Sequence, residues 1–315
     1  MRMAKSFIRL TPARAKALRR AYRLMRAHFG HLHWWPGETP FEVCVGAILT
    51  QNTSWSNVER AIANLKAARV LEPGKLFALS ASELAALIRP AGYFNVKARR
   101  LRSFLRVLVE EFGGDLERLF AGETTAVRER LLAINGVGPE TADSLLLYAG
   151  GHQRFVIDAY TKRIFQRHGW SGADAGYEDL QQLCEWALDE KPRRERLDYW
   201  QDFHAQLVMV GKDFCRTRQP RCAECPLKPL LPPKTRAGAS EHCPQGARTP
   251  PRSRTASRPR LAARSTVQGA GQRFDRRFAL VAAASRGRLA VRGQCPDAPG
   301  RAAAGGQRPL GESAA

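Results

Sequence analysis

The stretch LLAINGVGPETADSLLLYAG, residues 131–150, interrupts an apolar helical pattern with Gly136-Val137-Gly138 and restarts it at Pro139. Glycine lets the backbone turn sharply and lets another molecule approach without a Cβ in the way. Proline suits the first turn of a helix, whose unpaired N–H groups and partial positive charge can hold a phosphate oxygen. The stretch therefore predicts two helices joined by a tight hairpin that grips a phosphate. Taken alone, it is also compatible with an ordinary turn between two helices.

The charge of the chain points to a polyanionic partner. The 315 residues carry a net charge of +22. Such a field favours nucleic acid first and a membrane surface second, and a basic surface that binds neither is the third interpretation. Residues 231–315 carry 16 Lys and Arg against 4 Asp and Glu, a net +12, which leaves +10 for residues 1–230. The first part of the chain is therefore basic in its own right.

Membrane insertion and secretion are not expected from the sequence. No run approaches the roughly eighteen apolar residues of a membrane span, and residues 1–20 lack the apolar segment of a secretory signal. The chain has seven cysteines, an odd number, and four of them are scattered, namely Cys44, Cys184, Cys243 and Cys295. A disulfide framework is therefore not expected, and we expect a reducing, cytoplasmic location.

Helices dominate the pattern up to about Pro232. Apolar residues recur at helical spacing between Gly and Pro breaks, with no sustained alternation, which predicts an all-α fold of about ten helices. Residues 232–315 are rich in Arg, Ala, Gly, Ser and Pro and predict a disordered basic tail. The tail is either an arm that adds nonspecific DNA affinity or a frame-shifted translation of a GC-rich reading frame. The abrupt change inside a cysteine motif favours the second interpretation.

One carboxylate stands out downstream of the hairpin. Asp158 follows Gly138 by twenty residues, in the stretch FVIDAYTKRIF. Alone, it reads as the N-cap of a helix that begins at Ala159. The other interpretation is a carboxylate whose pKa and orientation are set by buried neighbours.

The hairpin 131–150, Asp158 and the cysteine spacing together resemble the helix-hairpin-helix (endonuclease III-like, HhH-GPD) DNA glycosylase superfamily, over about residues 10–230. The resemblance implies two α-helical lobes: a six-helix barrel over 41–151, which contains the hairpin, and a lobe of terminal helices from 1–40 and 152–231. It also implies that a monomer binds double-stranded DNA containing damaged bases, at the nucleoid. The damaged nucleotide would be flipped into a pocket between the lobes.

Glu140 decides which chemistry the resemblance implies. Bifunctional members carry a lysine two residues after the second hairpin glycine, where this chain has Glu140. A carboxylate cannot form a Schiff base, so direct hydrolysis remains, with Asp158 stabilising the oxocarbenium-like sugar and orienting or deprotonating water. We expect a monofunctional glycosylase of base excision repair for an alkylated purine such as 3-methyladenine. The alternatives are an endonuclease III-like glycosylase and AP lyase on oxidised pyrimidines, and a non-catalytic DNA-binding module.

Three tryptophans form the expected base pocket. Trp34 and Trp35 lie in HWWP, and Trp55 follows LTQNT. Aromatic faces attract a cationic base by about 0.5–2 kcal/mol per contact, although each Trp could equally be core. The resemblance to the 3-methyladenine glycosylase branch implies that these three stack on the base. It places Glu140 at the pocket edge and, less securely, Lys212 within the pocket.

Several residues are predicted to contact the DNA besides Gly136 and Gly138. Gln51 lies where the superfamily places a polar wedge that fills the gap left by the flipped base; the other interpretation is a cap of the turn. Lys97 and Arg99 follow a Gly-aromatic turn and predict phosphate contacts, or else a solvated helix face.

Cys215, Cys222 and Cys225 are spaced C-x6-C-x2-C. Superfamily members with a [4Fe–4S] cluster have a fourth cysteine after five more residues, where this chain has Leu231. Three thiolates could hold a cluster with Cys243 or another ligand, the site could be an empty remnant, or the fourth cysteine was lost with the frame. Zinc is a weaker option because no second pair stands at ordinary spacing. Any such site would be structural.

Overall fold

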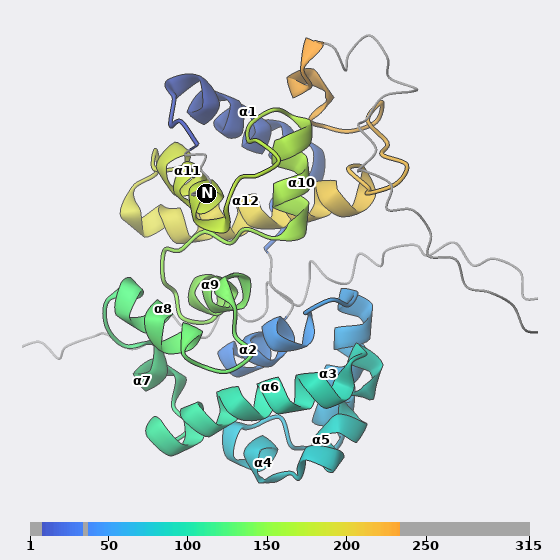
Figure 1. Cartoon of the computed structure of the whole chain (residues 1–315), viewed down its shortest axis with the longest axis vertical. Coiled ribbons are helices and arrows are strands. Elements are labelled where there is room, and N and C mark those ends of the chain that lie inside the picture. Colours follow the sequence, from blue (N-terminus) through green and yellow to red (C-terminus); the bar gives the residue numbers. More distant parts are fainter. Residues whose placement is uncertain (1–7, 34–36, 234–315) are drawn as a thin grey trace, which may run out of the picture.

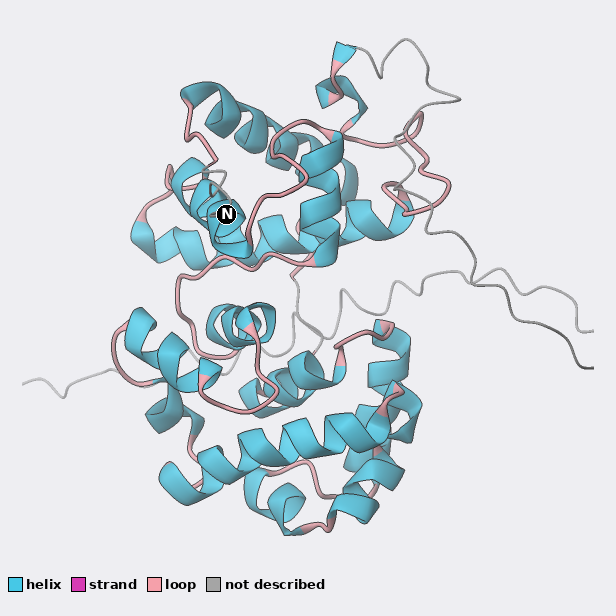
Figure 2. Cartoon of the chain, viewed as in Figure 1, coloured by secondary structure: helices cyan, strands magenta, loops and turns pink. Residues whose placement is uncertain are grey.

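The computed structural model describes residues 8–33 and 37–233, and these ranges are all-α, which confirms the predicted fold class. Figure 1 shows two groups of helices, one above the other, and Figure 2 shows helices joined by loops without a strand in these ranges. The lower group contains α2 Pro40–Leu49, α3 Trp55–Ala67, α4 Pro73–Ala78, α5 Ala81–Leu87, η1 Arg89–Ala91, α6 Phe94–Arg106, η2 Val107–Glu111, α7 Leu116–Phe120 and α8 Thr124–Leu132. The upper group contains α1 Pro12–Phe29, α10 Ala159–Arg167, α11 Tyr177–Ala187, α12 Arg193–Asp213 and η3 Lys228–Leu230.

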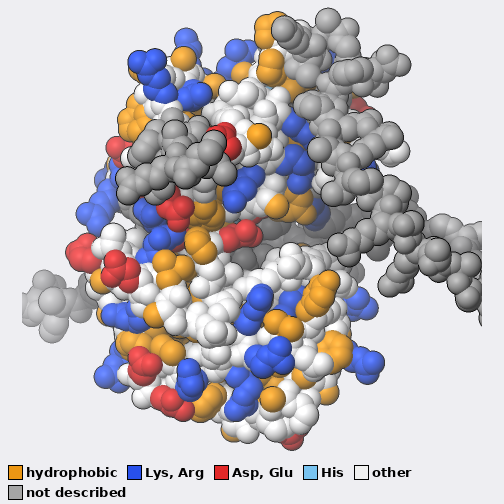
Figure 3. Space-filling view, in the orientation of Figure 1, with side chains coloured by type: hydrophobic (Ala, Val, Ile, Leu, Met, Phe, Trp, Pro, Cys, Tyr) orange, Lys and Arg blue, Asp and Glu red, His pale blue; other side chains and the backbone are white. Residues whose placement is uncertain are grey.

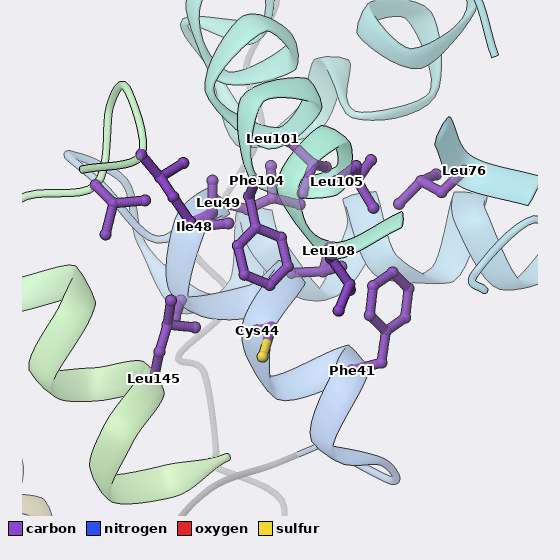
Figure 4. Close-up of a cluster of buried hydrophobic side chains, with 14 of the residues drawn as sticks. Phe41, Cys44, Ile48, Leu49, Leu76, Leu101, Phe104, Leu105, Leu108 and Leu145 are labelled. Atoms are coloured by element: carbon purple, nitrogen blue, oxygen red, sulfur yellow. The ribbon is translucent and has the colours of Figure 1, made fainter. Parts of the chain in front are cut away.

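Helix α2 is the centre of the lower group. Thr39 caps it, Pro40 begins it, and every residue from Phe41 to Leu49 is buried. Its one charged residue, Glu42, pairs with Lys66 of α3 at 2.9 Å, and a helix that is otherwise apolar on every side must be surrounded. In Figure 4 its side chains Cys44 and Ile48 lie beside Phe104 of α6 and Leu145 of the hairpin helix.

A second hydrophobic cluster holds the upper group together. It joins Leu18 and Met25 of α1 to Phe165 of α10, Leu183 of α11 and Phe203 of α12. Segments from both ends of the described chain therefore share one core. The clusters show where side chains pack; the domain boundaries at 40, 151 and 231 stay a prediction.

Helix α9, Pro139–Tyr148, lies between the two groups. Its residues Leu145 and Leu146 belong to the lower cluster, and Leu147 belongs to the upper one. The second helix of the hairpin thus belongs to both cores, and the segment that follows it, 149–158, leads from one to the other. No helix within 8–33 or 37–233 has the length and hydropathy needed to cross a bilayer.

A buried carboxylate ties the hairpin to α11. Asp143 of α9 is fully buried and accepts two hydrogen bonds from Arg128 of α8, at 2.7 and 3.1 Å. It also accepts from the Tyr177 hydroxyl at 2.8 Å and from Gln181 Nε2 at 2.7 Å. Buried charge is tolerated only when it is paired and hydrogen-bonded, and four donors meet that condition here.

Candidate active site

Asp158 lies where segment 151–158, which has no regular secondary structure, meets α10. It is the N-cap of that helix, and its Oδ1 accepts a hydrogen bond from Thr161 N–H at 2.7 Å. Its other oxygen, Oδ2, lies 3.8 Å from Nε2 of His204 on α12. The residue is 9 % exposed. The N-cap interpretation is confirmed, and Oδ2, which takes no part in the cap, leaves the carboxylate able to act on a second group.

Glu140 faces this carboxylate from the first turn of α9. The residue as a whole is exposed, whereas its carboxyl group is partly desolvated by the protein around it. Burial is the main cause that raises the pKa of Glu140, to about 7, and the negative charge of Asp158 raises it further. The positive charge of Lys162 lowers this pKa in part. Glu140, with its pKa raised to about 7, and Asp158 are therefore close enough to interact beside the hairpin turn.

The raised pKa of Glu140 makes stability pH-dependent. A carboxyl whose pKa is higher folded than unfolded stabilises the fold below its unfolded pKa, near 4.5, and this contribution is lost as pH rises through about 7. We expect Glu140→Gln to have a higher Tm than the wild type at pH 8, with the difference shrinking toward pH 5. Melting curves between these pH values test it, with Glu129→Gln, an exposed glutamate of α8, as control. A Tm difference that does not change with pH would contradict the assignment.

The hairpin turn needs one of its glycines for packing. Gly136 has φ +90°, and a Cβ there would overlap the Arg100 side chain. Gly138 is the N-cap of α9, and nothing lies within 4 Å of where its Cβ would be. Pro139 begins the helix, as predicted. The N-terminus of α9 is thus open to a phosphate, whose binding stays a prediction.

Gln51 is tied into the hairpin. Its Nε2 donates to the Gly136 carbonyl at 3.2 Å and to Thr141 Oγ1 at 3.0 Å, while its Oε1 accepts from Arg100. The side chain therefore links the turn after α2 to the turn before α9. Its predicted role as a wedge would require some of these bonds to break when DNA binds, and that role stays a prediction.

The predicted phosphate contact of Lys97 is wrong for this structure. Its side chain is 1 % exposed, and its Nζ donates to the carbonyls of Leu49 at 2.9 Å and Ala91 at 2.7 Å. These carbonyls end α2 and η1, where a cation satisfies acceptors that the helices leave unpaired. Burial and the nearby charge of Arg100 lower the pKa of Lys97 to about 8. Arg99, two positions further along α6, is exposed, and its phosphate contact stays a prediction.

Substitutions of Lys97 and Arg99 should differ in their effects on stability and on DNA binding. We expect Lys97→Met to lower the free energy of unfolding by about 2–4 kcal/mol, since two buried carbonyls lose their donor. Arg99→Met should leave stability within about 0.5 kcal/mol and weaken DNA binding, as removal of a phosphate contact does. Urea unfolding and DNA titration at two salt concentrations measure both effects. Equal stability of the two variants would contradict the capping role of Lys97.

The expected base pocket is only partly within the described residues. Trp34 and Trp35 lie outside them. Trp55 begins α3, packs against the lower core while partly exposed, and donates from Nε1 to Glu59 at 3.0 Å. Lys212 is exposed in the last turn of α12, next to Gly211, against which Tyr160 packs. Their roles in base binding stay predictions.

Within residues 37–233 the cysteine segment supplies three thiols, Cys215, Cys222 and Cys225, where a four-thiolate cluster needs four. Burial is the main cause that raises the pKa of Cys225 to about 11, and the neighbouring thiols Cys215 and Cys222 raise it further. Hydrogen bonds from backbone N–H groups lower this pKa in part. The Cys215 sulfur accepts from Arg167 at 3.3 Å, and the fourth position is Leu231 at the end of η3. Among residues 8–33 and 37–233, no three His, Cys, Asp or Glu side chains are arranged to hold a metal. Cys243 lies outside the described residues.

Several residues that support Asp158 were not expected from the sequence. The hydroxyl of Tyr177 accepts from Ile157 N–H at 3.4 Å, and Gln181 donates to the Phe155 carbonyl at 2.6 Å. Glu185 accepts from Phe155 N–H at 3.0 Å. Helix α11 therefore holds the segment that delivers Asp158, and Asp143 in turn holds Tyr177 and Gln181. Asp158 itself could be found from its local motif. Tyr177 and Gln181 could not, because they lie 20 to 38 residues along the chain from the residues that they bind.

Comparison with known proteins identifies the family. A model described as "HhH-GPD superfamily base excision DNA repair protein" matches residues 45–188. The Methanocaldococcus jannaschii protein named "Putative DNA repair glycosylase MJ1434" is 45 % identical over 208 residues, 66 % of this chain and 92 % of that protein. The chain belongs to the HhH-GPD superfamily.

Solved structures of HhH-GPD proteins have the same fold. A Helicobacter pylori 3-methyladenine DNA glycosylase (MagIII), bound to 1,N6-ethenoadenine, superposes with a TM-score of 0.54 at 28 % identity, over 62 % of this chain and 95 % of that one. An endonuclease III in a non-covalent DNA complex superposes with a TM-score of 0.59 at 21 % identity, over 72 % and 99 %. The predicted superfamily and its helix-hairpin-helix fold are confirmed.

Proposed function

We propose that this chain is a monofunctional DNA glycosylase that hydrolyses the N-glycosidic bond of a flipped, alkylated purine. The observation that carries the proposal is the electrostatic interaction of Asp158 with Glu140 in the first turn of α9. Asp158 is the carboxylate that stabilises the oxocarbenium-like sugar and orients or deprotonates the attacking water. Glu140 stands where a covalent mechanism would need an amine, and a carboxylate supplies none.

The two carboxyl groups also favour a positively charged base as the substrate. The charge of Asp158 raises the pKa of Glu140 because two like charges repel at short range. A positively charged N-methylated purine beside them relieves that repulsion, whereas a neutral base does not. Trp55 adds an aromatic face, which attracts a cation. The similarity to a glycosylase of 3-methyladenine supports the same substrate class.

Double-stranded DNA is the proposed partner. The open N-terminus of α9 and exposed Arg99 are the proposed phosphate contacts. Figure 3 shows Lys and Arg side chains over both groups of helices, so a duplex lying across them would meet positive charge on each. The predicted monomeric state and the location at the nucleoid stay proposals.

One observation favours the lyase alternative. Lys162 of α10 lies close enough to Glu140 to lower its pKa, so an amine does stand near the proposed site. Its ammonium also lies 5.7 Å from the centre of the Tyr177 ring, which holds it by a cation–π contact. If the chain cleaves strands, Lys162 is the candidate nucleophile.

Single-turnover base release tests the proposal. Duplexes carrying 3-methyladenine, 1,N6-ethenoadenine, thymine glycol or uracil are incubated with excess protein, then divided between neutral and alkaline treatment. We expect release of the alkylated purine, with the abasic strand intact until alkali is added. Strand cleavage without alkali, with a borohydride-trapped complex that Lys162→Gln abolishes, would establish the lyase instead. Tight DNA binding without release of any base would establish the binding module.

A further inference from the structure

His204 is a buried titratable residue beside the proposed catalytic carboxylate. It lies on α12, 5 % exposed, and its ring packs edge-on against Phe155 at 6.3 Å between centroids. Its Nε2 points to Asp158 Oδ2 at 3.8 Å, and within the described part of the chain this atom has no hydrogen-bond partner. A buried polar atom without a partner costs free energy and calls for an explanation.

The hydroxyl of Tyr148 determines which ring nitrogen carries the proton. Burial lowers the pKa of His204 more than the charge of Asp158 raises it, so the imidazole is neutral and has one N–H. Nδ1 lies 2.6 Å from the Tyr148 hydroxyl, closer than the Gln201 carbonyl, which is 3.3 Å from the same hydroxyl. Donation from Tyr148 to Nδ1 leaves the proton on Nε2, facing Asp158. The opposite tautomer would turn a lone pair toward a carboxylate.

We propose that His204 is a positioning residue for base release, holding Asp158 Oδ2 through Nε2–H while Thr161 N–H holds Oδ1. This inference rests on the proposed function of Asp158. At 3.8 Å the attraction is between the charge of Oδ2 and the N–H dipole of Nε2. Because Thr161 N–H holds Oδ1 at the same time, the carboxylate keeps one orientation toward the sugar and water.

Three variants separate positioning from packing. His204→Phe keeps an aromatic ring beside Phe155 and removes the N–H. His204→Gln places an amide N–H near the position of Nε2, and Tyr148→Phe removes the donor that sets the tautomer. We expect His204→Phe to slow single-turnover base release about tenfold or more at unchanged DNA affinity, and His204→Gln to restore most of the rate.

The pH profile is a readout that packing alone would not change. Loss of the N–H disfavours the ionised carboxylate, so the acidic limb of the rate profile should move to higher pH in His204→Phe and return in His204→Gln. The titratable groups that interact with Asp158 besides His204 are Glu140 and Tyr148 of α9 and Tyr160 of α10. Lys162 of α10 acts on Glu140, and Asp202 of α12 acts on Tyr148. Because Glu140 titrates near pH 7, the profiles are compared in the Glu140→Gln background as well. A wild-type rate and profile in His204→Phe would overturn the proposal.

The tautomer gives a second test that needs no activity. Long-range proton–nitrogen NMR of the wild type at pH 7 should show His204 protonated on Nε2 alone, and a proton on Nδ1 or on both nitrogens would overturn the proposal. If His204→Phe does not fold, the NMR measurement of the wild type and the base-release rate of His204→Gln test the proposal instead. Absence of base release by the wild type would instead refute the proposed function, leaving the tautomer to be judged separately.

Discussion

Asp158→Asn is expected to abolish base release, slowing the single-turnover rate by about 10³-fold or more, while leaving the fold intact. Asparagine is as good an N-cap as aspartate, so the bond from Thr161 N–H to Oδ1 survives the change. What is lost is the negative charge that stabilises the sugar cation and activates water, and such a group contributes about 10²–10⁴-fold. DNA affinity should stay equal or rise, because a negative charge near phosphates has been removed.

Asp115→Asn is the matched control for this variant. Asp115 caps α7 in the same way, its carboxylate accepting from the N–H groups of Glu117 and Arg118, but it is exposed. The same chemical change at that cap should leave base release at the wild-type rate. Rates, DNA affinity and Tm are measured for both variants. Retained activity in Asp158→Asn would sink the hydrolytic mechanism and, with it, the role of His204.

Asp143→Ala is expected to destabilise the fold by about 3–5 kcal/mol, the cost of leaving a buried charged partner without its counter-ion. Arg128 has a side chain only 15 % exposed, and its guanidinium would lose both bonds to Asp143. Tyr177 and Gln181 would lose an acceptor too, and both hold the segment 155–157. Base release should therefore fall along with stability, because the support of Asp158 loosens.

A double variant identifies the origin of the loss. Asp143→Leu combined with Arg128→Met removes both charges, so it should cost less than the sum of the two single changes. Asp198→Ala is the control: its side chain is 58 % exposed and pairs with His31, a surface ion pair worth about 1 kcal/mol or less. Chemical unfolding of Asp143→Ala, the double variant, its two single variants and Asp198→Ala measures these values. A loss below about 1 kcal/mol in Asp143→Ala would show that the network is not structural.

Local chemistry made much of the fold predictable. Pro139 after Gly138, and Asp158 before Ala159, are start signals that depend on a few neighbouring backbone groups, and both helices begin there. The all-α class followed in the same way from helical spacing between breaks. Glu140 could be singled out because its position is counted from the glycines of the turn, with no knowledge of what packs around it.

The sequence by itself therefore determined the helices, the hairpin and the place of Asp158 at a helix cap. Tertiary structure alone decided what surrounds them. Lys97 stands in a basic stretch and was expected at the surface, but its ammonium is buried and donates to the last carbonyl of α2, Leu49, and the last carbonyl of η1, Ala91. Asp143 and His204 gave no local signal, because their partners lie 15 to 56 residues away along the chain. Such contacts exist only once distant helices share a core, since burial is what makes an unpaired charge costly and selects its partners.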